Sequence, residues 1–285
     1  MIRTGIFVVV VGAAAGIASG ELIYGTTIQN TLVSWDSAAP ATILSGRAIT
    51  GLAQNEFIMG LDVRPSTGEV YALGSTSRLY RVDTATGAAT QVGAGQFTPT
   101  LNGAQFGMDF NPTVDLIRIS SGANQNLRVS PVTGAVVGTD TAFAYAAGDP
   151  GAGTDPDLVH VAYTNSRPGA TSTVLYGIDT DRDVLVRIGT PNNGQMTTVG
   201  SLGTQINAFG GFDISGATDI AYAAVQAENE ALSSLWTIDL NTGAATRVGE
   251  IGGGLVITTM TVVPSPATLA LSAAGLLVMV SRRKR

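Results

Sequence analysis

Aspartates recur at one position of a repeated sequence and are the residues of this chain best suited to chemistry. Asp62, Asp109 and Asp213 each lie between two hydrophobic residues, so strand alternation puts the carboxylate on one face. If such strands surround an axis, the carboxylates could converge and hold a hard cation such as calcium. Alternatively, each aspartate accepts hydrogen bonds from backbone N–H groups or an arginine of the adjoining unit. The equivalent residues of two other repeats are Ala162 and Thr261, which favours the structural alternative.

A second acidic run could also hold calcium. Asp179, Asp181 and Asp183 are spaced like the first ligands of an EF-hand loop. That loop needs glycine at its sixth position and glutamate at its twelfth, where this chain has Val184 and Thr190. The run also falls at the turn of a repeated hairpin. The sequence therefore favours a structural turn, with calcium as the alternative.

Other groups that could support catalysis are scarce. The chain has no cysteine, which excludes disulfides, thiolate nucleophiles and cysteine zinc sites. Its one histidine, His160, lies in an apolar strand pattern that is more typical of a packed core residue than of a catalytic base. Recurrent aromatic residues are interpreted as packing residues, with a sugar-stacking platform as the alternative. They are Tyr71, Tyr80, Tyr163, Tyr176, Tyr222 and Trp236. We assign no catalytic residue and no cofactor apart from the calcium alternative.

The N-terminal segment predicts export. Arg3 is followed by a charge-free apolar run and a small-residue site that ends at Gly20, which is the pattern of a secretory signal peptide. We expect residues 1–20 to be a signal peptide, which signal peptidase removes between Gly20 and Glu21. The alternative is a buried N-terminal strand over residues 6–11.

The C-terminal segment predicts a membrane anchor, so we expect a hydrophobic helix at each end of the chain. Residues 262–280 could form a thin or tilted span at ~1.5 Å per residue. The alternative is a helix packed on the domain. A basic cluster follows, and its cations would stay in the cytoplasm with the domain outside. The cluster consists of Arg282, Arg283, Lys284 and Arg285.

Residues 264–285 resemble a PEP-CTERM sorting tail, which combines a proline motif, one membrane helix and an arginine-rich end. The motif is represented by Pro264, Ser265 and Pro266. Ser265 is a departure, because the family usually has glutamate between the prolines. The resemblance implies processing by an exosortase-type enzyme in a diderm bacterium that makes extracellular polysaccharide. That polysaccharide is then a candidate partner.

The charge of the central part excludes one class of partner. Without the cations of the two ends, ten arginines and no lysine stand against 21 acidic residues, a net charge of −11. Nucleic-acid binding needs lysine and arginine to replace the counterions of phosphates. We therefore expect no nucleic-acid partner. The hydrophobic content of 45% also excludes an intrinsically disordered chain.

One line of sequence recurs between residues 21 and 263. Residues 79–93 return as residues 235–249, and weaker copies occur at 127–137 and 175–186. Alternating apolar residues flank the pattern D-x-x-T-G in the two strongest copies. In such a turn the aspartate bonds nearby amides and the glycine takes a left-handed conformation, so each copy predicts a hairpin.

The spacing of the repeats predicts an all-β fold, a β-propeller. The aspartate column advances in steps of 47, 53, 51 and 48 residues, which suits four-stranded blades. The chain begins with the later part of one unit, residues 22–45, and ends with its first strand, residues 255–263. We therefore expect the last strand to join the N-terminal strands and close five blades. The alternatives are a β-sandwich and an open solenoid, and a solenoid does not explain complementary ends.

The central part, residues 21–263, also resembles the bacterial DUF4394 domain. The resemblance includes residues 60–65 (GLDVRP), 110–115 (FNPTVD), 175–179 (LYGID) and 191–194 (PNNG). It implies an exported, propeller-like domain. The family has no established activity, so it implies no functional residues.

Two classes of function follow from these features. The first is a non-catalytic cell-surface or matrix protein that uses the propeller as a rigid binding disc. The second is an exported hydrolase or lyase that acts on polysaccharide, because a propeller channel can hold paired carboxylates. The sequence favours the first, because no carboxylate pair is evident outside the repeat columns. The separation of carboxylates at the channel would discriminate between the two.

Overall fold

The computed structural model describes residues 20–263. The predicted signal peptide, the predicted hydrophobic helices and the sorting motif with its basic end lie outside these residues, with two exceptions. Gly20 and Glu21 at the expected cleavage site are described, and Val262 and Val263, the first residues of the predicted span, belong to a β-strand instead of a helix. Within the described part, no helix is long and apolar enough to cross a membrane.

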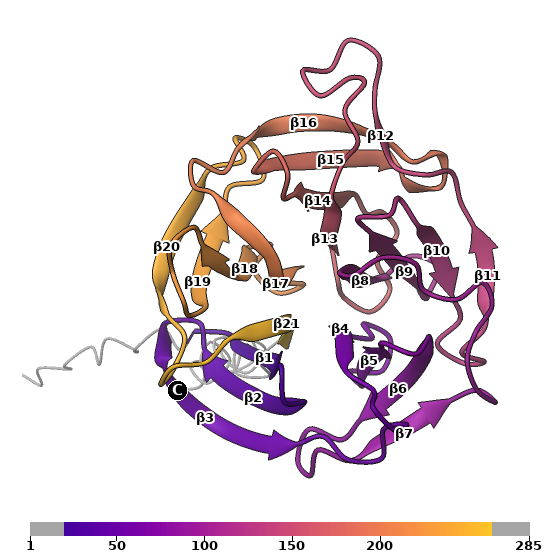
Figure 1. The fold of residues 1–285 in the computed structure, drawn as a ribbon, viewed down its shortest axis with the longest axis vertical. Coiled ribbons are helices and arrows are strands. Elements are labelled where there is room, and N and C mark those ends of the chain that lie inside the picture. Colours follow the sequence, from indigo (N-terminus) through magenta and orange to yellow (C-terminus); the bar gives the residue numbers. More distant parts are fainter. Residues whose placement is uncertain (1–19, 264–285) are drawn as a thin grey trace, which may run out of the picture.

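Five sheets, each with four antiparallel strands, surround a central axis and form the blades of a propeller (Figure 1). The first blade contains, from the axis outward, β21 (Ile257–Val263), β1 (Leu22–Thr27), β2 (Thr31–Asp36) and β3 (Ala39–Ala48). The second contains β4 (Ile58–Val63), β5 (Val70–Gly74), β6 (Arg78–Val82) and β7 (Ala89–Val92). The third contains β8 (Phe106–Asn111), β9 (Leu116–Ser121), β10 (Asn126–Val129) and β11 (Val136–Thr139).

The fourth blade carries two additions to the common plan. Its four strands are β13 (Leu158–Tyr163), β14 (Leu175–Asp179), β15 (Val184–Thr190) and β16 (Gln195–Ser201). The short strand β12 (Ala144–Tyr145) pairs in parallel with β16, and the 3-10 helix η1 (Pro191–Asn193) joins β15 to β16. The fifth blade contains β17 (Ile206–Ile214), β18 (Ala221–Ala227), β19 (Ser234–Ile238) and β20 (Ala245–Glu250).

The ring closes as the repeat count predicts. The C-terminal strand β21 pairs with the N-terminal strand β1, and Val263 lies opposite Leu22. The first blade is therefore built from both ends of the described chain. This pairing covers the inner edge of β1, which would otherwise be open to pairing with another chain. The predictions of an all-β fold and of five blades are confirmed.

The repeated hairpin turn explains why the blades share one shape. Asp83 Oδ1 accepts a hydrogen bond of 2.8 Å from the amide of Ala85, and Gly87 has a φ of 80°. In the fifth blade Asp239 makes the same contact with Asn241 at 2.8 Å. Side chains that bond their own turn amides and a glycine at positive φ fix the turn locally.

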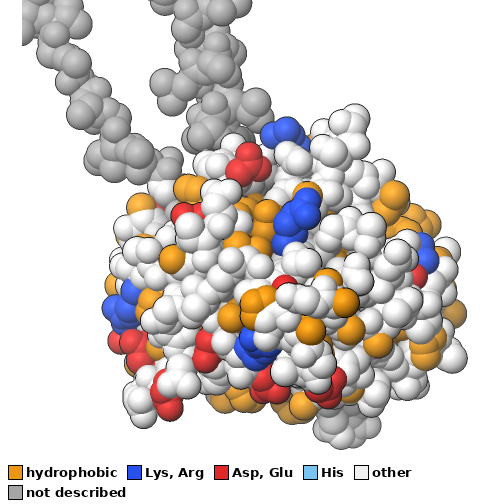
Figure 2. Space-filling model, turned by 90° about the horizontal axis from the view of Figure 1, so that it is seen from above, with side chains coloured by type: hydrophobic (Ala, Val, Ile, Leu, Met, Phe, Trp, Pro, Cys, Tyr) orange, Lys and Arg blue, Asp and Glu red, His pale blue; other side chains and the backbone are white. Residues whose placement is uncertain are grey.

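The hydrophobic core is divided among the seams between neighbouring blades. Leu73 and Leu79 of the second blade, for example, pack with Phe110 and Ile119 of the third. Most of the recurrent aromatic residues, including Tyr71, are buried in these seams, as expected for packing residues. Figure 2 shows charged side chains scattered among uncharged atoms on one side of the molecule. The core therefore holds adjacent blades together.

The five innermost strands run in the same direction and define two faces of the disc. We call the face at which they begin the start face, and the opposite one the end face. Residues 59–61, 106–108, 159–161, 210–212 and 259–260 lie at one level around the axis. Leu22 and Val263 pair at the end face, so both ends of the described chain lie there, in the first blade.

Candidate functional site

Three carboxyl groups meet at the axis of the propeller, near the end face. Asp62 on β4, Asp109 on β8 and Asp213 on β17 are 2%, 1% and 4% exposed. One carboxylate oxygen from each lies within 4.8 Å of the others. The convergence that the repeat column predicts is therefore present. Three buried acidic groups this close together could bind a metal ion.

Each aspartate also joins its blade to the next one. It accepts a hydrogen bond from a backbone N–H group of the innermost strand that follows around the axis. The three contacts are Asp62 Oδ2 with Phe110 at 2.7 Å, Asp109 Oδ1 with Tyr163 at 2.9 Å, and Asp213 Oδ2 with Val262 at 2.6 Å. Buried backbone amides need such acceptors, so the carboxyl groups hold neighbouring blades together.

Thr261 extends this arrangement to the seam between β21 and β4. Its hydroxyl oxygen accepts the N–H of Val63 at 3.2 Å. At the remaining seam, between β13 and β17, the column residue is Ala162, which has no side-chain acceptor. There the N–H of Ile214 bonds to Oδ1 of Asp213, its own neighbour, at 2.6 Å. Four of the five seams among the described residues therefore carry the inter-blade bond.

The electrostatics of the site favour protons on these groups. Burial raises the pKa of all three carboxyl groups. The charge of Asp213 raises the pKa of Asp62 further, and the charges of Asp62 and Asp213 raise that of Asp109. Hydrogen bonds from backbone N–H groups act in the opposite direction, because they stabilise the carboxylate.

The hydroxyl of Thr261 gives a second reason to expect a proton here. It lies 3.0 Å from Asp62 Oδ1 and 3.1 Å from Asp213 Oδ2, yet it has one proton to donate. A proton on one of the two carboxyl groups, donated to Thr261 Oγ1, would satisfy both contacts. The ring can therefore hold a shared proton. A calcium ion would need six to eight oxygen ligands, and several of these oxygens already accept N–H groups.

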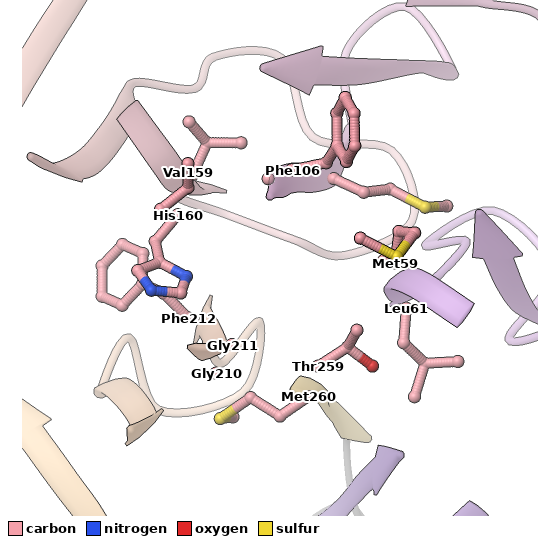
Figure 3. A pocket seen from close by; sticks show the side chains of 14 residues that line it. Met59, Leu61, Phe106, Val159, His160, Gly210, Gly211, Phe212, Thr259 and Met260 are labelled. Atoms are coloured by element: carbon pink, nitrogen blue, oxygen red, sulfur yellow. The ribbon is translucent and has the colours of Figure 1, made fainter. Parts of the chain in front are cut away.

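His160 lies on β13, two residues before Ala162, and belongs to the core (Figure 3). Its ring lies beside Phe212 and is 3% exposed, and Nε2 has no hydrogen-bond partner among the described residues. Burial lowers the pKa of His160 to about 4. The cavity that it lines has a volume of about 20 Å³, which is room for about one water molecule. The cavity beside this neutral imidazole is too small to hold a substrate.

The second acidic run forms the turn between β14 and β15. Asp179 Oδ1 accepts the backbone N–H groups of Asp157 and Asp181, both at 3.1 Å, and the hydroxyl of Tyr145 donates to its other oxygen. Asp183 has a φ of 50° and accepts the N–H of Ile206 at 2.9 Å. Within the described residues these aspartates do not converge as the central three do.

The residues at the expected cleavage site lie at the start of the first blade. Glu21 is 8% exposed, and its backbone N–H donates to Ser37 Oγ at 2.9 Å. Its carboxylate accepts the hydroxyl groups of Ser215 and Thr218, the latter at 2.9 Å. Glu21 therefore belongs to the folded domain and joins the first blade to the fifth.

Two features of the surface escaped the sequence analysis. On the start face, a cavity of about 240 Å³ lies between exposed apolar residues, among them Ile28, Phe57 and Phe209. On the end face, a smaller cavity adjoins a buried arginine, Arg118. The sequence contains one signal of the second, because Arg118 stands where the other four blades have a tyrosine paired with the central column.

The fold and the central ring define a five-bladed β-propeller whose blades are joined by buried carboxyl groups. The chain belongs to the family described as "Domain of unknown function (DUF4394)", whose model matches residues 31–261. A chain in the solved structure "Crystal structure of Nidogen/Laminin Complex" is similar, with a TM-score of 0.50 and 10% identity. The match covers 86% of this chain and 98% of that one, and shows the fold alone. No curated protein matches the chain.

Proposed function

We propose that this protein is an exported, non-catalytic propeller that is anchored at the cell surface and serves in binding or as a structural part of the matrix. One observation carries the non-catalytic part. The carboxyl groups that could best support catalysis are buried and accept the N–H groups of neighbouring blades. A catalytic carboxylate must reach its substrate.

Export and anchoring are supported by the sequence of the two ends. Arg3 and the apolar run that ends at Gly20 suit signal peptidase, and the proline motif with its basic end suits an exosortase-type enzyme. The membrane is then reached through the C-terminal helix, with residues 282–285 in the cytoplasm. Extracellular polysaccharide is the partner that such a location favours.

The location is tested by fractionating cells that produce the full chain and sequencing its N-terminus. We expect the protein in the envelope or the medium, beginning at Glu21. Intact Met1 on cell-surface protein would overturn the signal-peptide proposal. Recovery from the cytoplasm would overturn export itself.

The molecular role is tested by a glycan-binding array combined with a polysaccharide-hydrolysis screen on the full chain. Binding without bond cleavage is the expected result. Cleavage of any polysaccharide would replace this proposal with the hydrolase or lyase alternative, provided that the cleavage activity disappears when the protein is removed from the sample.

A further inference from the structure

One blade departs from the others at the second strand from the axis. The residue paired with the central column is Tyr24, Tyr71, Tyr176 or Tyr222 in four blades, and it is Arg118 in the third. An arginine needs partners for five N–H donors in a place where tyrosine needs one for its hydroxyl. This exchange is therefore not explained by packing alone.

The guanidinium of Arg118 is buried but not fully satisfied. Its side chain is 3% exposed. Nε donates to the Tyr163 hydroxyl at 3.1 Å, Nη1 donates to Asn126 and to Asp140 at 2.8 Å, and Nη2 donates to Asn192 at 2.7 Å. These four bonds leave one N–H of Nη2 without a partner among the described residues.

A second arginine shares the same carboxylate. Arg128 donates from Nε and Nη2 to the two oxygens of Asp140, at 2.8 and 2.9 Å. Its Nη1 has no partner among the described residues. Two guanidinium groups and one carboxylate leave a local charge of +1, in a domain whose net charge is −11. This location is thus positive in an acidic protein.

Both arginines line one cavity of about 140 Å³ on the end face, in the seam between the third and fourth blades. This seam lies across the axis from the first blade, where the described chain ends (Figure 1). The other lining residues are the amides Asn111 and Asn192, the phenol of Tyr163, and the apolar Val114 and Leu116. The cavity therefore combines cations, neutral hydrogen-bonding groups and an apolar wall.

We propose that this cavity binds a carboxylate carried on a hydroxylated ring, which is the chemistry of a hexuronic acid. The carboxylate would accept the remaining N–H groups of Arg118 and Arg128, because a guanidinium suits a planar carboxylate. The amides of Asn111 and Asn192 would meet the ring hydroxyls, and Val114 and Leu116 its apolar face. One negative charge neutralises the site, whereas a phosphate dianion would leave an excess charge.

This inference deepens the proposed function, because it rests on the propeller being a binding module, but it does not depend on export. The test uses the full chain and calorimetric titration with glucuronate, glucose and inorganic phosphate at constant ionic strength. We expect glucuronate to bind, and glucose and phosphate to bind at least about tenfold more weakly. A further titration with a polyuronate distinguishes a polysaccharide ligand from a free sugar acid. Tighter binding of the polyuronate, per polymer chain, than of glucuronate indicates a polysaccharide, and equal binding indicates a free sugar acid.

Arg128→Gln should weaken glucuronate binding at least about tenfold, because it removes the charge that Asp140 does not balance. Arg81→Gln is the matched control. Arg81 occupies the equivalent place on β6, where it pairs with Tyr71 as Arg128 pairs with Arg118. It should leave the affinity unchanged.

Val114→Asp provides a second variant that leaves the arginine network intact. Val114 is 57% exposed, so the change should not affect folding, and its new charge should repel a carboxylate. Three outcomes would overturn the inference. The wild type does not bind glucuronate, it binds phosphate as tightly as glucuronate, or both variants keep the full affinity for glucuronate. Array binding that persists in Arg128→Gln would then place the binding role of the propeller elsewhere.

Discussion

Asp109 differs from the other two aspartates of the ring in its hydrogen bonds. Among the described residues, one of its oxygens accepts a bond, from Tyr163, whereas both oxygens of Asp62 and of Asp213 are engaged. Asp109 is thus the aspartate of the ring with an oxygen that is still available to bind a cation. It is also the residue at which the structural role and the calcium alternative can best be separated.

Asp109→Ala should destabilise the fold by about 1–3 kcal/mol, because it leaves the buried N–H of Tyr163 without an acceptor. Urea unfolding with and without calcium measures this loss, and we expect calcium to have no effect. Asp109→Asn is the control, since it keeps an acceptor oxygen and should lose less. A calcium-dependent rise in the melting temperature of the wild type, absent in Asp109→Ala, would show that the ring is a cation site.

His160 should make stability depend on pH. Its folded pKa of about 4 lies below the ordinary 6.5, so the unfolded chain binds the proton more tightly. The contribution is complete above pH 6.5 and is lost as the pH falls towards 4, by up to about 3 kcal/mol. Unfolding free energies of wild type and His160→Phe at pH 7 and pH 4 isolate it. If the two proteins lose equal stability on acidification, His160 is not the cause.

At the scale of elements, the innermost strands and their seams are the unit of construction. The bond from Asp62, Asp109, Asp213 or Thr261 to the next strand repeats at four seams. At the fifth seam, between β13 and β17, the column residue is Ala162, and among the described residues this bond is absent. The propeller therefore tolerates one seam without this bond at the axis. The two blades of that seam pack through a shared core, and the N–H of Ile206 donates to Asp183 Oδ1 at 2.9 Å.

Thr261→Val should weaken the seam between β21 and β4. It removes one of the two acceptors of the Val63 N–H, the other being Asp62 Oδ1 at 2.7 Å. It also leaves Asp62 and Asp213 with no hydroxyl between them. We expect a loss of about 1–3 kcal/mol in urea unfolding. Thr261→Ser keeps the hydroxyl and should lose clearly less. Equal losses in the two variants would attribute the effect to packing of the methyl group.

The elements were largely predictable because their signals are local. Turn residues such as Asp83 and Gly87 fix hairpins, and the aspartate column marks the innermost strands, so the blades and the convergence at the axis follow from the sequence. The arginine cavity did not follow, since Arg118, Asp140 and Asn192 come from different parts of two blades. The hydrogen-bond partners of the aspartates could not be predicted either, because only the assembled ring shows which backbone N–H group donates to each carboxyl group.

At the scale of the whole molecule, closure depends on one strand. β21 supplies the innermost strand of the first blade, pairs with β1 and packs beside β4 and β17. It also carries Thr261, and through Val262 it provides an N–H group to Asp213. Two seams and one blade therefore depend on this single strand.

Deleting residues 255–263 from the full chain should therefore open the ring. The deletion exposes the backbone edge of β1, which would be free to pair with another chain. It also removes Ile257 and Met260 from the core that joins the first and fifth blades. We expect aggregation or loss of the cooperative unfolding transition, measured by size-exclusion chromatography and thermal melting. Deleting residues 168–171, in the loop between β13 and β14, is the control and should leave a folded monomer. A monomer that lacks 255–263 yet melts at the wild-type temperature would show that this strand does not close the propeller.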